Sequence, residues 1–256
     1  MSLPAALAVA LYPSASDIFT ILGNVASELL PPGVEVAQGQ VNRVPEPKPV
    51  DFVEMWPFMT PRLGTNADTP IDCVFTAAIA GDVMSVSAVN PNPLFSGKLM
   101  IGSPVFGVNV EAGTVITGQT GGTPGGVGTY TVAPTQTVGS EKMAAGVAYL
   151  TQPVEAVVQL DFHGPNAWDN SATFATVFRD EKGVALFAKQ WKALFDNEVN
   201  GLTPLYCDDP KQVPFTNDQD QYETRFVVHA HMQVNQSLGL PQQFADQLDA
   251  TLIAVP

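Results

Sequence analysis

The stretch that decides the fold is the run VEAVVQLDF at positions 154–162. Apolar and polar side chains alternate along it, and the apolar set is Val154, Ala156, Val158, Leu160 and Phe162. Successive side chains of a β-strand point to opposite faces, so this pattern predicts a half-buried strand. Residues 222–234 alternate in the same way. We therefore expect two long strands in a central sheet.

Helices are expected before and between these two strands. Ser14 and Asp17 have the spacing of a capping box, and apolar residues then recur at helical spacing up to Leu29. The sequence Pro31-Pro32-Gly33 predicts the end of this helix. Further elements are predicted as follows: helices from about 170 to 178 and over 184–195, strands over 34–38, 51–59 and 251–255, and a helical segment over 241–248.

The middle of the chain differs in composition from its flanks. Residues 69–148 hold 13 of the 21 glycines and only six charged residues. Within this block, residues 118–128 contain too many glycines for a helix and predict a loop or a hairpin. We interpret the block as a small all-β domain inserted into an α+β host domain. The host, formed by residues 1–68 and 149–256, would have a mixed or antiparallel sheet flanked by helices.

The charge balance argues against a protein that grips nucleic acid. The chain has 25 acidic and 11 basic residues, a net charge of −14, and no basic run. Affinity for phosphates comes from Lys and Arg, so such a chain should repel DNA. An acidic surface suits a conduit through which DNA slides, although solubility alone also explains the charge.

Cysteine and apolar patterns give little sign of secretion or membrane insertion. Cys73 and Cys207 form no CxxC motif, so we expect buried reduced thiols. Residues 3–11 are apolar, but no basic residue precedes them, which argues against a cleaved signal peptide. No run reaches the ~20 apolar residues that a membrane-spanning helix needs.

A metal site is the sharpest catalytic hypothesis that the sequence offers. His229 and His231 lie on one face of the predicted strand 222–234, and His163 with Asp161 could complete a ligand set. The competing interpretation is that these side chains lie on the polar face of a sheet whose other face is buried. The apolar residues at alternate positions of the same strand favour this second interpretation.

Other candidate sites are weaker. Asp208, Asp209, Asp218 and Asp220 lack the spacing of a calcium loop and are typical of turns. An acid–base pair among Glu155, Asp161 and Glu223 is conceivable in any sheet, and the scattered Trp56, Trp168 and Trp191 favour packing over sugar stacking. Motifs of serine hydrolases, phosphate-binding loops and zinc proteases are absent from the sequence. We expect no catalytic residue, no metal and no cofactor.

Several stretches of the flanks resemble phage neck-terminator proteins. They are residues 40–47, 51–53, 158–165, 204–206, 214–215 and 222–225, which read QVNRVPEP, DFV, VQLDFHGP, PLY, PF and YETR. No single motif carries a mechanism, but their order is fairly specific. In the middle block, residues 113–117 and 126–132 are similar to a β-rich repeat that is inserted in diverse phage structural proteins.

This resemblance implies a structural protein of the virion neck or tail, assembled in the host cytoplasm. Family members are expected to form a homo-oligomeric ring, often a hexamer, that joins the tail tube or sheath to the head connector or adaptor. DNA would pass through the ring without specific binding, and no membrane would be involved. Arg43, Arg62 and Arg225 are scarce cations in an acidic chain and are our candidate subunit contacts. Isolated surface cations of little energetic value are the simpler interpretation of each.

Two other functions stay open at this stage. The middle block could bind carbohydrate or a host surface, which binding tests on the isolated block would reveal. Alternatively, the two histidines of strand 222–234 could serve a metal-dependent hydrolase, which metal analysis would reveal.

Overall fold

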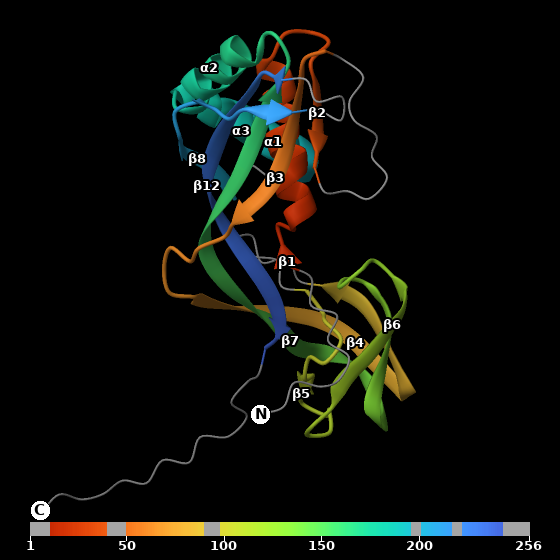
Figure 1. Cartoon of the computed structure of the whole chain (residues 1–256). Helices are drawn as coiled ribbons and strands as arrows, with labels where there is room; N and C mark the ends of the chain where they lie inside the picture. The colour runs from red at the N-terminus through yellow and green to blue at the C-terminus, as the bar shows by residue number, and fades with distance from the viewer. Residues whose placement is uncertain (1–10, 40–49, 90–97, 196–200, 217–221, 243–256) are drawn as a thin grey trace, which may run out of the picture. The chain divides into compact units, whose positions relative to one another are not determined.

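The computed structural model describes residues 11–39, 50–89, 98–195, 201–216 and 222–242 (Figure 1). The chain divides into two compact units. The helical unit comprises Leu11–Asn66 and Gln152–Ser237, and the β unit comprises Ala67–Thr151 with the described residues from Leu238 on. Residues 238–242 therefore group with the β unit, although the sequence analysis placed them in the host. That residues 69–148 form an inserted domain stays a prediction.

Helix α1, Ala15–Leu29, begins where the sequence predicts it. The Ser14 side chain accepts a hydrogen bond from the backbone N–H of Asp17 at 3.2 Å, and the Asp17 carboxylate accepts one from the Ser14 N–H at 2.8 Å. This reciprocal pair is the predicted capping box. Pro31 and Pro32 follow the helix end at Leu30, as expected for residues that cannot continue a helix.

The sheet of the helical unit is mixed. Its strands run in the order β1-β12-β7-β3-β2, with β8 and β9 also paired to β12. The short strand β2 is parallel to β3, whereas β3 pairs antiparallel with β7, and β8 and β9 pair antiparallel with β12. The bounds are β1 Leu11–Tyr12, β2 Glu35–Gln38, β3 Phe52–Met59, β7 Gly128–His163, β8 Leu202–Cys207, β9 Lys211–Gln212 and β12 Arg225–Pro241. A separate pair is formed by β10 Phe215–Thr216 and β11 Tyr222–Glu223.

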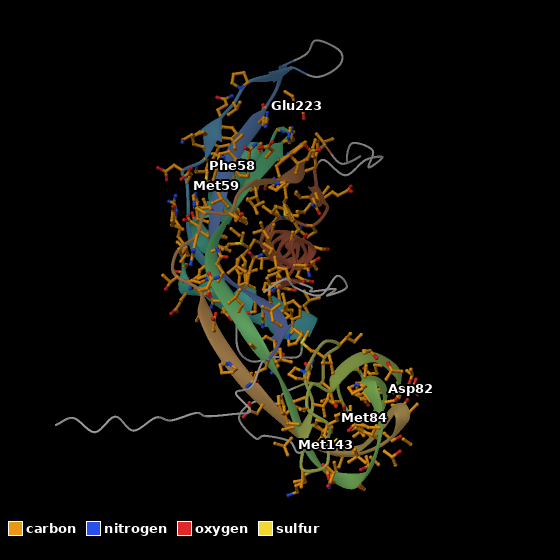
Figure 2. The ribbon with its side chains drawn as sticks, turned by 90° about the horizontal axis from the view of Figure 1, so that it is seen from below. Phe58, Met59, Asp82, Met84, Met143 and Glu223 are labelled. Atoms are coloured by element: carbon orange, nitrogen blue, oxygen red, sulfur yellow. The ribbon has the colours of Figure 1, made fainter. Side chains whose placement is uncertain are left out.

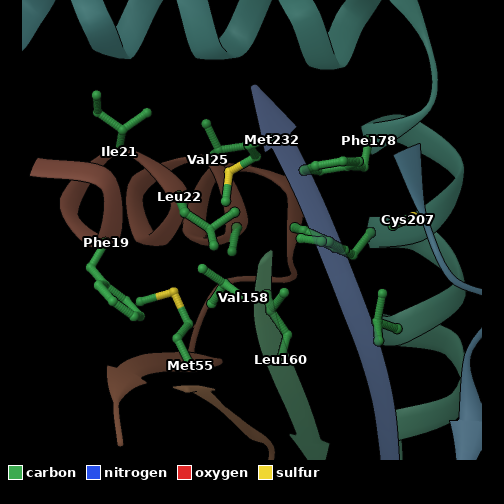
Figure 3. Close-up of a cluster of buried hydrophobic side chains, with 14 of the residues drawn as sticks. Phe19, Ile21, Leu22, Val25, Met55, Val158, Leu160, Phe178, Cys207 and Met232 are labelled. Atoms are coloured by element: carbon green, nitrogen blue, oxygen red, sulfur yellow. The ribbon is translucent and has the colours of Figure 1, made fainter. Parts of the chain in front are cut away.

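All three helices contribute to one core on one face of this sheet. Helices α2, Ala167–Phe178, and α3, Glu181–Phe195, join α1 over the apolar side chains of β3, β7 and β12 (Figure 3). The alternating set of residues 154–162 and the set from Phe226 to Val234 both lie in this core, which confirms the two predicted strand faces. Helix α2 begins three residues before the predicted start at 170.

The β unit is built around the first part of β7. Strands β4 Ala67–Val89, β5 Phe106–Gly107 and β6 Val115–Gly122 all pair antiparallel with β7. Its core includes Met84 and Met143, which are labelled in Figure 2. The glycine-rich tract 118–128 forms the predicted hairpin, and Gly122 has φ +95°, a conformation that favours glycine at the turn. The predicted α+β class with a mixed sheet and helices is thus confirmed.

Some local predictions were wrong or lie outside the described residues. Strand β12 extends to Pro241, where the sequence analysis began a helical segment, and the residues from 243 on are outside the described part. The predicted strand 222–234 is interrupted at Thr224, between β11 and β12. Cys73 and Cys207 are free and buried, as predicted. In the described part of the chain, no helix has the length and apolar character needed to cross a bilayer.

Candidate assembly surfaces

The sheet of the helical unit has an outer face that points away from the three helices. Side chains between the core positions of β3, β7 and β12, together with neighbours from β8, form this face. Its main members are Trp56, Phe58, Glu155, Gln159, Asp161, His163, Tyr206, Arg225, His229 and His231. This outer face carries polar and aromatic side chains, whereas the core on the other face of the sheet is apolar.

Arg225 makes an ion pair across this outer face. Its guanidinium lies 2.5 Å from the Asp161 carboxylate, whose side chain is only 3% exposed, while that of Arg225 is 21% exposed. The Gln159 amide donates a second hydrogen bond to Asp161 at 2.8 Å. A buried carboxylate needs such partners because burial removes its hydration. The structure therefore gives Arg225 a partner inside its own chain, and its use as a subunit contact stays a prediction.

Arg62 lies in an exposed segment that follows β3. Its Nε–H donates to the carbonyl oxygen of Gly64, and its backbone forms an isolated bridge with Val154. The next residue, Leu63, donates its N–H to the Pro153 carbonyl at 3.0 Å. Arg62 is thus held at a defined place on the surface without a carboxylate partner among the described residues. Arg43 lies outside the described residues.

The end of β3 exposes apolar side chains that the sequence analysis did not single out. Phe58 is 53% exposed and Met59 is 48% exposed (Figure 2). A largely apolar pocket of about 240 Å³ lies beside them, lined by the start of α1, residues 57–60 and residues 156–158. The available signal was the run WPFM at 56–59, because four consecutive apolar residues cannot all face one core in a strand.

Both histidines of β12 lie beside acidic side chains, and Asp208 lies within 3.9 Å of both rings. His229 Nδ1 lies 3.1 Å from Asp208, and His231 Nδ1 lies 2.6 Å from Glu155. The His231 ring also stacks on Tyr206, with ring centroids 4.1 Å apart. Partial desolvation and then the hydrogen bond to Glu155 raise the pKa of Tyr206 above its ordinary value. The two histidines, Tyr206 and their acidic neighbours thus form a network of contacting side chains.

The other residues of the metal and acid–base hypotheses make contacts of their own elsewhere on this face. His163 stacks on Phe52, with Nδ1 3.5 Å from Glu223, while Asp161 pairs with Arg225. Among the described residues, no three His, Cys, Asp or Glu side chains are grouped in a way that could hold a metal ion. Asp209 pairs with Arg179 at 3.0 Å, and Asp218 and Asp220 are outside the described part.

The three tryptophans belong to the helical unit but do not form a platform. Trp191 is buried in the core, Trp168 is exposed and meets Phe226 edge-on, and Trp56 packs over Gly39. Their separate environments are typical of packing residues, as the sequence analysis favoured.

Comparison with protein families adds the decisive observation. A family model described as phage neck terminator protein matches residues 104–254, which is more than half of the chain. The chain belongs to the phage neck terminator protein family. None of the curated proteins with which this terminator was compared matches it.

The matched segment of the terminator includes the quoted motifs from 158–165 to 222–225. It begins at residue 104, inside the glycine-rich middle block, so the family model covers part of the β unit as well. Residues 40–47 and 51–53, which also resemble the family, precede the matched segment. The similarity of the middle block to an inserted repeat stays a prediction.

Membership of this family makes the terminator a structural protein of the virion neck. Such a role agrees with the prediction that the chain is not an enzyme. A neck protein acts through its contacts with neighbouring subunits. The exposed surfaces described above are therefore candidates for such contacts.

Proposed function

We propose that the terminator assembles into a closed ring, of six subunits, at the end of the tail tube. The ring would join the tube or sheath to the head connector and continue the channel through which DNA passes. Family membership carries this proposal, since a neck protein must bridge the two parts of the virion. Two features of the chain support it.

The first feature is that several cationic side chains form ion pairs within the chain. Arg179 pairs with Asp209, Arg225 pairs with Asp161, and Lys189 pairs with Glu28 at 2.7 Å. Each of these cations is neutralised by a carboxylate of the same chain. Six copies of a chain with net charge −14 would carry about −84. A ring of this kind would surround DNA without gripping it, because phosphate binding depends on available cations.

The second feature is the apolar surface at the end of β3. Phe58, Met59 and the nearly half-exposed Leu63 lie within six residues of sequence, and Phe58 and Met59 line the apolar pocket. Exposed apolar side chains that cluster in this way are typical of interaction sites. A contact between two different surfaces of the same chain closes into a ring when the rotation between subunits is a simple fraction of a turn.

Native mass spectrometry of the terminator with its tail-tube partner tests the ring. We expect the complex to contain six subunits of 27.1 kDa, so that the ring adds about 163 kDa to the mass of the partner. Because the tail end could template the ring, the mass must be measured with the partner present. Only open or polydisperse assemblies with the tube would contradict the proposal.

Fluorescence anisotropy with a short DNA duplex tests the channel. We expect no measurable binding at ~0.15 M salt, since few cations are available to release counterions from DNA. Tight binding that survives ~0.2 M salt would contradict the proposal.

A further inference from the structure

A second pocket of the helical unit has a polar floor. Its volume is about 320 Å³, and it is lined by residues 31–34, Val50, Asp51, Asn166 and Asn170. It therefore lies where the segment after α1, the start of β3 and the start of α2 meet. In Figure 1, β3 runs from this end of the unit towards the segment that leads to β4.

The position of Asp51 in this pocket is fixed from two sides. Its carboxylate accepts hydrogen bonds from the backbone N–H of Asn166 at 2.9 Å and from the Asn166 side-chain amide at 2.8 Å. Gly164 has φ +99°, and a Cβ at this position would collide with the Val50 carbonyl and with Asp51. The loop before α2 thus fits closely against Val50 and Asp51, so the carboxylate is held in place before any ligand arrives.

Asn170 adds a second polar side chain to this pocket. The residue is only 5% exposed, yet its side-chain amide has no hydrogen-bond partner among the described residues. The amide lines the pocket, where a ligand could reach it. A water molecule or a ligand in the pocket can therefore supply the hydrogen bonds of this amide.

The acceptor groups that line the pocket favour a bound cation with several N–H donors. The Asp51 carboxylate accepts hydrogen bonds and the Asn170 amide oxygen is able to accept one, while among the described residues no cation pairs with Asp51. An anion would be repelled by Asp51 and by the net charge of −14. A guanidinium offers five N–H donors in a planar fork, which suits two acceptors on different elements.

Among the arginines that the structure describes, Arg62 lacks a carboxylate partner. Of the arginines in the described part, Arg179 and Arg225 pair with carboxylates, whereas Arg62 is exposed and hydrogen-bonds only the Gly64 carbonyl. Arg62 follows the far end of β3, which has eight residues and spans about 26 Å at ~3.3 Å per residue. The Arg62 side chain is too short to reach Asp51 of its own chain, so it can meet this pocket only on another copy.

We propose that Arg62 of one subunit enters the pocket formed by Asp51, Asn166 and Asn170 on the next subunit. The guanidinium would pair with Asp51 and satisfy the Asn170 amide. The contact joins two different surfaces, at opposite ends of β3, and is therefore the head-to-tail type that closes a ring. This inference rests on the ring of the proposed function and names the contact that builds it.

Charge reversal at Arg62 tests the contact in assembly. With the tail-tube partner present, Arg62→Glu should raise the subunit concentration for half-maximal ring formation on the order of 100-fold, because it places two carboxylates together. Lys182→Glu is the matched control, since Lys182 is an exposed cation of α3 and the charge change is the same. This control should change assembly by less than about threefold. Equal effects of both variants would mean that only net charge matters, and would overturn the inference.

Disulfide trapping tests which surfaces meet. Arg62→Cys and Asn170→Cys are made in separate chains, mixed with the tail-tube partner and oxidised; the native Cys73 and Cys207 are buried and should not compete. We expect a covalent dimer that forms only in the mixture, with tryptophan-monitored melting of each variant close to wild type. Rings that assemble without this mixed dimer would overturn the inference and leave the ring intact. A wild-type chain that forms no ring with its partner would instead refute the proposed function.

Discussion

Arg225→Ala is expected to destabilise the helical unit by about 3 kcal/mol, because it leaves a buried carboxylate without its cation. Asp161 is only 3% exposed, and after the change Gln159 would be its remaining side-chain donor among the described residues. Removing one member of a buried pair costs about 3–5 kcal/mol, and the 21% exposure of Arg225 places this case at the lower end. For a chain of this size we expect the melting temperature to fall by roughly 6–12 °C.

Tryptophan fluorescence is the assay of choice for this variant. All three tryptophans, Trp56, Trp168 and Trp191, belong to the helical unit, so their signal reports on the unit that contains the ion pair. Arg225→Met combined with Asp161→Leu should recover most of the loss, since an apolar pair needs no compensation for buried charge. Lys182→Ala serves as a control at an exposed cation.

A melting temperature within about 1 °C of wild type for Arg225→Ala, together with weakened ring formation, would refute this reasoning. Arg225 would then act at a subunit contact, as the sequence analysis suggested, and the Asp161 pair would contribute little to the fold.

Three further predictions concern the β unit, the histidines and a loop glycine. Replacing residues 69–148 with a short Gly/Ser linker should leave a soluble protein with cooperative tryptophan-monitored unfolding; loss of such material would show that the block belongs to the host core. Changing His229 and His231 together to Gln should alter assembly little and leave the metal content at zero, whereas stoichiometric zinc or iron in the wild type would revive the hydrolase hypothesis. Gly164→Ala should lower stability by more than ~1 kcal/mol, because φ is +99° and the new Cβ would meet the Val50 carbonyl; unchanged chemical denaturation would contradict the tight fit of this loop.

The sequence predicts best those elements whose signals are local. The capping box at Ser14 and the alternation of residues 154–162 depend on neighbours within a few positions, and both predictions are confirmed. Strand β7 is much longer than the predicted run because its first part contains Gly139, Gly146 and Pro134, which interrupt any period of two. Those residues are tolerated because β4 and β6 pair with this part of the strand.

Features of the candidate site that join distant segments could not be predicted. Asp51 meets Asn166, 115 positions away, and Asp161 meets Arg225, 64 positions away. Neither pair has a periodic signal in the sequence, since each depends on the order of strands in the sheet. In the sequence, Arg62 and Arg225 are two scarce cations with nothing to distinguish them. In the structure, Arg225 pairs with Asp161, whereas Arg62 hydrogen-bonds the Gly64 carbonyl.

The most direct test of the central claim is a cryo-electron microscopy reconstruction of the neck of purified virions. We expect this chain to form a closed ring between the head connector and the tail tube, with Arg62 of each subunit at the Asp51 pocket of the next. Absence of the chain from purified virions, or its presence there only as isolated copies outside the neck, would contradict the account.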